Sequence, residues 1–178
     1  MIDIDDRSVP ATFRDIVFAD MRRAARLIVK VQDEIDPQFR IATPEGDYWL
    51  AVTLPREAHE RLAVLKRVSL FMAWKQAPCF ILASERTVPD CVYALGVSHK
   101  EVHACYALIR RTPRPWSAKN FGTIEWVDRS QVGQEMIDLL PRGTRSIDRQ
   151  ELAMLDQWFG PHGKFPAVHI PTGEMRGL

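Results

Sequence analysis

Four side chains that could bind a metal or take part in catalysis lie close together in the middle of the chain. The run SHKEVHACYALIRR contains His99, Glu101, His103 and Cys105. Imidazole, carboxylate and thiolate groups are the usual ligands of zinc, and a cysteine beside a histidine can act as a nucleophile. The same run also begins with Ser98 and has a glutamate three residues later, which is the pattern of a helix N-terminal capping box.

We predict a capped helix for this run rather than a metal centre. On a helix His99 and His103 share one stripe, whereas Glu101 lies about 200° from His99 and cannot join them. The order HKEVH lacks the glutamate that directly follows the first histidine in zincins, and no P-C-x-x-C follows it as in zinc deaminases. Cys105 also diverges from His103 by about 200°, which favours a core cysteine over a nucleophile. We therefore predict no metal and no cofactor, and keep the two histidines as candidate binding residues.

A basic loop with one aromatic residue follows the same run. Residues 102–124 contain no acidic side chain, and the segment RRTPRPWSAKNFG is rich in positive charge. Such a loop can bind a phosphate backbone and stack a base, whereas the alternative is a solvated helix end followed by a proline-stiffened connector. Four charges without a known fold motif favour the connector, and both interpretations stay open. The candidate binding residues of this loop are Arg110, Arg111, Arg114, Trp116 and Lys119.

Other catalytic signatures are missing from the sequence. GPHGK, residues 160–164, resembles part of a phosphate loop, but no serine or threonine follows the lysine and a strand rather than a helix is predicted next. There is no G-x-G-x-x-G, G-x-S-x-G or C-x-x-C. An enzyme would have to assemble its site from distant residues, for example His103, Glu85, Asp90 and Arg110.

Composition and charge indicate one soluble globular domain. The chain has 178 residues, 46% of them apolar, and 24 basic residues stand against 23 acidic ones. Near-neutral charge provides no global field for nucleic acid or an anionic membrane. The acidic N-terminus is unlike a secretory signal, and no apolar run reaches the roughly 18 to 20 residues that span a bilayer. We expect a cytoplasmic protein whose Cys79, Cys91 and Cys105 are buried and free, with Cys79 opposite Gly96 in a hairpin.

The hydrophobic pattern predicts an α+β fold with a mainly antiparallel sheet of about five or six strands and helices packed on it. We expect an N-terminal arm at residues 1–9, a single domain at 10–171 and a tail at 172–178. The expected order is roughly α-β-β-α-β-β-α-β-α-α-β. Its elements are a helix over 10–34, a hairpin around Pro44–Gly46, a helix over 56–75, a hairpin over 79–98, the helix that begins at Ser98, a strand over 122–128, helices over 130–140 and 148–159, and an edge strand over 164–170.

The functional prediction is an accessory or regulatory protein that binds another macromolecule without turnover. Five tryptophans with ordinary charge and no catalytic signature favour recognition, because aromatic residues are enriched at protein interfaces. The element order is also similar to that of small α+β scaffolds that act as adaptors or secretion-type chaperones, which is an analogy of layout alone. We expect the partner to be a protein and expect no binding to a membrane. The sequence is also compatible with a homo-oligomer. Nucleic-acid binding through residues 110–119 and an enzyme built around His103 are the alternatives.

Overall fold

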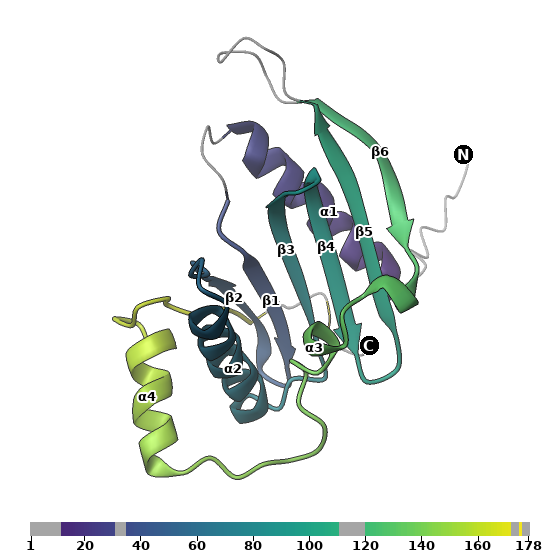
Figure 1. Ribbon diagram of the computed structural model, residues 1–178. Helices are drawn as coiled ribbons and strands as arrows, with labels where there is room; N and C mark the ends of the chain where they lie inside the picture. The colour runs from purple at the N-terminus through teal and green to yellow at the C-terminus, as the bar shows by residue number, and fades with distance from the viewer. Residues whose placement is uncertain (1–11, 31–34, 111–119, 172–174, 176–178) are drawn as a thin grey trace, which may run out of the picture.

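A computed structural model describes residues 12–30, 35–110, 120–171 and 175 (Figure 1). Within these residues, seven antiparallel strands form one sheet in the order β6-β5-β4-β3-β1-β2-β7, which confirms the α+β class with slightly more strands than predicted. The N-terminal arm and most of the tail lie outside the described residues. The elements are α1 Phe13–Lys30, β1 Gln38–Thr43, β2 Gly46–Ala51, α2 Ala58–Trp74, β3 Cys79–Thr87, β4 Asp90–Ser98, β5 Val102–Arg110, β6 Asn120–Val127, the 3-10 helix η1 Arg129–Gln131, α3 Gln134–Ile137, α4 Arg149–Phe159 and β7 Val168–Ile170.

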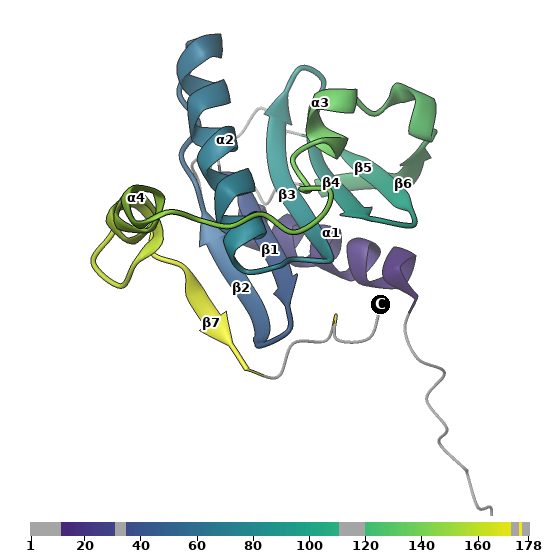
Figure 2. The same ribbon diagram turned by 90° about the horizontal axis from the view of Figure 1, so that it is seen from below.

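Helices cover both faces of the sheet (Figures 1 and 2). Helix α1 packs on one face across β3, β4 and β5, while α2 lies on the other face with α4 beside it. The α1 contact follows from its stripe of side chains three and four residues apart, which are fully buried. Because both faces are covered there, β4 and the first half of β3 are nearly continuous apolar runs, whereas β3 ends in the polar residues 84–87. The α1 stripe consists of Phe13, Val17, Met21, Ala24 and Ile28.

A buried ion cluster joins α1 to the β1–β2 hairpin. The Arg40 guanidinium lies 2.8 Å from the carboxylate of Asp47 and 3.3 Å from that of Asp20. One oxygen of each carboxylate is buried without a hydrogen-bond partner. Burial raises the pKa of Asp20, and the charge of Arg40 opposes this increase.

The predicted β1–β2 hairpin and the predicted edge strand are confirmed. Gly46 follows the turn with φ +138°, and an added Cβ there would lie within 2.4 Å of the carbonyl oxygen of Ile170 in β7. Only glycine fits this close approach without strain. The short strand β7 pairs with β2 at the sheet edge, where Pro166 just before it costs no ladder hydrogen bond.

The predicted helix from Ser98 is wrong, because this run forms the β4–β5 turn and strand β5. The Ser98 hydroxyl accepts a hydrogen bond from the N–H of Glu101 at 3.0 Å, as the capping box requires, but the backbone reverses here into a hairpin. Strand β5 is apolar on both faces, with Cys105 and Ala107 toward α1 and Ala104 toward α2. Such a sequence fits both periodicities, and pairing with β4 and β6 decides for the strand.

Two smaller predictions are wrong in detail, and two are confirmed. The helix expected over 130–140 is only η1 and the single turn α3, interrupted at Gly133, whose backbone is extended. Cys79 pairs with Ser98 rather than with Gly96, because the hairpin turns one residue later than expected. The three cysteines are free and buried, as predicted. The helix predicted over 148–159 is confirmed as α4, and the structure adds a complete capping box at Asp148.

One residue of the predicted C-terminal tail belongs to the core. Met175 was assigned to the tail, but its side chain is buried with the α1-side core. Within the described ranges, no helix is both long and apolar enough to cross a membrane.

Candidate functional site

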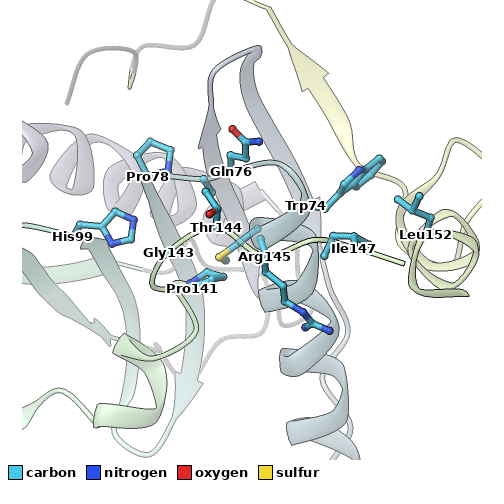
Figure 3. A pocket seen from close by; sticks show the side chains of 13 residues that line it. Trp74, Gln76, Pro78, His99, Pro141, Gly143, Thr144, Arg145, Ile147 and Leu152 are labelled. Atoms are coloured by element: carbon cyan, nitrogen blue, oxygen red, sulfur yellow. The ribbon is translucent and has the colours of Figure 1, made fainter. Parts of the chain in front are cut away.

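A cleft of about 460 Å³ opens at one end of the sheet on the side of α2 (Figure 3). Four parts of the chain form it: the end of α2 with its link to β3, the β4–β5 turn, the segment that joins α3 to α4, and the first half of α4. Its lining residues are Met72, Ala73, Trp74, Gln76, Ala77, Pro78, His99, Pro141, Gly143, Thr144, Arg145, Ile147 and Leu152.

Two exposed apolar side chains mark one side of the cleft. Trp74 is 40% exposed and Leu152 is 38% exposed, although both are large. The ring centres of Trp74 and Phe71 lie 5.9 Å apart in an edge-to-face arrangement. The Lys75 ammonium lies 4.2 Å from the centre of the Trp74 ring. These contacts fix the orientation of Trp74 while leaving much of the indole open to solvent. A rigid, exposed tryptophan is a typical anchor for a binding partner.

The backbone that ends α2 is strained at the cleft. The N–H of Ala77 donates to the carbonyl of Met72 at 2.9 Å, and the N–H of Gln76 donates to that of Ala73 at 3.2 Å. This pair of bonds is the Schellman motif, whose left-handed position is usually glycine. Here that position is Gln76 with φ +52°, the only described non-glycine residue with positive φ. Strained backbone of this kind is concentrated at functional sites, which makes Gln76 a candidate binding residue.

His99 enters the cleft from the other side (Figure 3). It lies in the β4–β5 turn, where the Ser98 hydroxyl accepts from the N–H groups of Lys100 at 3.2 Å and Glu101 at 3.0 Å. These two bonds hold the turn that presents the imidazole. Of the predicted candidate binding residues within the described ranges, His99 is the one that lines this cleft.

His103 lies on the opposite face of the sheet, so the predicted shared stripe with His99 does not exist. Its imidazole is 2.6 Å from the carboxylate of Glu101 and packs beside Phe13 and Trp126 on the α1 side. In a strand, residues two apart share a face, which is why His103 and Glu101 meet here. Within the described part of the chain, no three His, Cys, Asp or Glu side chains are grouped so that they could hold a metal ion.

The basic loop is mostly outside the described residues, which include neither Arg111, Arg114, Trp116 nor Lys119. Arg110 is described and is exposed at the far end of β5. It lies seven positions along the strand from His103, a distance of about 23 Å in extended backbone. Glu85 and Asp90 lie near the β3–β4 turn. The residues considered for an enzyme site therefore do not meet around His103.

The cysteines offer no reactive thiolate. Burial raises the pKa of Cys79 to about 12 and that of Cys105 to about 12. Burial also raises the pKa of Cys91. Cys105 belongs to the core against α1, as predicted.

Most of the cleft was missed by the sequence analysis, because its walls are about 70 residues apart in the chain. One signal was available: Gln-Ala-Pro follows α2 where a glycine would be expected. Comparisons of this chain with protein-family models, with curated proteins and with solved structures find no match.

Proposed function

We propose that the protein binds a segment of another protein in this cleft and releases it chemically unchanged. The observation that carries the proposal is the combination of an exposed, oriented Trp74 with a strained Gln76 on one cleft wall. Interface hot spots are enriched in tryptophan, and strained backbone is concentrated at binding sites.

The chemistry of the lining supports binding over catalysis. His99 is the only imidazole among the described lining residues, and none of them is a carboxylate or a thiol. A catalytic histidine is normally oriented by a third group, and a nucleophile has a base within hydrogen-bond reach. The guanidinium of Arg145 contacts the carboxylate of Glu151, which fixes the segment between α3 and α4. The lining can thus donate hydrogen bonds and accept apolar groups, which are the requirements of recognition.

A protein segment fits the exposure of the rim. Trp74 and Leu152 face solvent at the edge of the cleft, whereas a small-molecule site would bury most of its ligand among enclosed side chains. An apolar side chain of a partner would pack against Trp74, and its backbone would accept hydrogen bonds from Gln76 and Thr144. The proposal retains the cytoplasmic setting expected from the sequence.

The test uses two tryptophans of matched exposure on opposite faces. Trp126 is 37% exposed on the α1 side, against 40% for Trp74. Random dodecapeptides displayed on phage are selected on the unmodified protein, and the affinity of a labelled selected peptide is measured by fluorescence anisotropy. We expect Trp74→Ala to weaken binding at least tenfold, because a hot-spot truncation costs about 2 kcal/mol. Trp126→Ala should change the affinity less than twofold.

Two further readouts complete this experiment. Mass spectrometry after prolonged incubation should find the bound peptide intact. A cleaved or modified peptide would show that the protein is an enzyme and would contradict the proposal of binding alone. Failure to enrich any peptide, or equal loss of binding in Trp74→Ala and Trp126→Ala, would contradict the proposal.

A further inference from the structure

A second hollow adjoins the cleft, with His99 as their shared wall. It encloses about 310 Å³ between the β4–β5 turn, η1 and the segment that follows α3. Unlike the cleft, it is lined mainly by polar and charged side chains. The lining residues are Val97, Ser98, His99, Lys100, Glu101, Val102, Arg129, Ile137, Leu140 and Arg142.

Positive charge dominates this hollow. Lys100, Arg129 and Arg142 stand against the single carboxylate of Glu101. That carboxylate is engaged by His103 at 2.6 Å. The hollow therefore keeps a local positive potential even though the chain as a whole is nearly neutral.

The cations of the hollow are largely available to a ligand. Lys100 and Arg129 form no ion pair with any residue in the described ranges. Arg142 lies 3.9 Å from the carboxylate of Asp138, with both side chains more than half exposed. Exposed pairs of this kind contribute little and exchange readily. An incoming anion would replace water rather than break a strong internal contact.

We infer that this hollow binds the carboxylate of an aspartate or glutamate in the same partner segment whose apolar side chain fills the cleft. The inference rests on the proposed function and specifies its ligand as an acidic segment with an apolar anchor. Complementary charge at a rim guides association and fixes the register of the bound chain. A carboxylate suits the site better than a phosphate, because Glu101 would repel a doubly charged group more strongly.

The first experiment compares two peptides and two charge variants. The peptides are one selected by display and its copy with every Asp and Glu changed to Asn and Gln. The test variant carries Lys100→Gln, Arg129→Gln and Arg142→Gln. The control variant carries three exposed α1 cations changed to glutamine on the opposite face, so that both variants have the same net charge. Its substitutions are Arg14→Gln, Arg22→Gln and Arg26→Gln.

We expect the unmodified protein to bind the acidic peptide about tenfold more tightly than its neutral copy at low salt, with the difference shrinking as salt is added. The test variant should bind both peptides equally, and the control variant should behave like the unmodified protein. Equal affinity of the two peptides for the unmodified protein would overturn the inference while leaving the proposed function intact. A phosphoserine peptide that binds far more tightly than the glutamate peptide would overturn the choice of carboxylate.

A second experiment needs no peptide and separates the two proposals. Acetate, which carries the single carboxylate of the proposed ligand, is titrated at constant ionic strength while the backbone amide signals of residues 98–101 are followed by NMR. A saturable shift that is absent from the test variant supports the anion site even if no peptide is enriched. A shift that does not saturate, or that persists in the test variant, contradicts it.

Discussion

Because Gln76 has a left-handed backbone conformation, we predict that replacing it by glycine makes the protein more stable but weakens its binding of a peptide. In the left-handed region a residue with a Cβ pays roughly 1 to 2 kcal/mol relative to its favoured conformations, whereas glycine does not. Glycine loses about 0.5 to 1 kcal/mol more chain entropy on folding, which offsets part of this gain. With φ +52° at the end of α2, Gln76→Gly should therefore raise the free energy of unfolding by about 0.5 to 1 kcal/mol.

The assay is chemical denaturation together with thermal unfolding, where this change corresponds to about 1 to 4 °C in Tm for a chain of this size. Gln76→Ala is the matched control, because it removes the amide and keeps a Cβ at the strained position. It should not be stabilised, yet both variants should bind a selected peptide more weakly than the unmodified protein does. If Gln76→Gly and Gln76→Ala have equal stability, the reasoning from strain is refuted.

Three further predictions concern the core of the fold. Gly96→Ala should destabilise the protein by about 1 to 3 kcal/mol, because its Cβ would lie 2.2 Å from a methyl group of Val17 in α1; unchanged denaturation midpoints would contradict this packing. With the pKa of Cys105 raised to about 12, the native thiol should stay unmodified by a thiol reagent at pH 8 and react once urea unfolds the chain; rapid modification of the native protein would count against its burial. Because the pKa of Asp20 is raised above its ordinary 3.8, the folded state holds the proton more tightly, and the stability of the unmodified protein relative to Asp20→Asn should increase as the pH falls through the folded pKa toward 3.8; a relative stability that decreases over this range would refute the assigned direction.

The sequence predicts those elements whose two faces differ or whose ends carry clear signals. Helix α1 has one apolar stripe, the β1–β2 turn has a glycine that its geometry requires, and α4 ends at Gly160 and Pro161. Strand β5 was predicted as a helix from the capping-box pattern at Ser98 and Glu101. Both of its faces are apolar, so that its pairing partners rather than its pattern decide its conformation. Of the two capping-box hydrogen bonds predicted between Ser98 and Glu101, the one accepted by the Ser98 hydroxyl is present, but it closes a turn between strands. The N–H of Ser98 donates to the backbone carbonyl of Glu101 rather than to its carboxylate.

The candidate site was predictable only in part. His99 was identified as a candidate binding residue from its residue type. The predicted helix placed it beside His103, whereas in the structure it faces the end of α2 across the cleft. Trp74 and Gln76 reach the same cleft as Thr144 through tertiary contacts that no local pattern encodes. The basic hollow is likewise lined by Lys100, Arg129 and Arg142, which come from three separate segments. No run of charged residues in the sequence therefore predicts it.

The most direct test of the central claim follows the indole N–H signal of Trp74 in a two-dimensional NMR spectrum. The chain has five tryptophans, and Trp74→Phe identifies the signal by its disappearance. On saturation with the selected acidic peptide, we expect this indole signal to shift and that of Trp126, on the opposite face, to stay in place. A peptide that binds tightly while shifting Trp126 and leaving Trp74 unchanged would contradict the account.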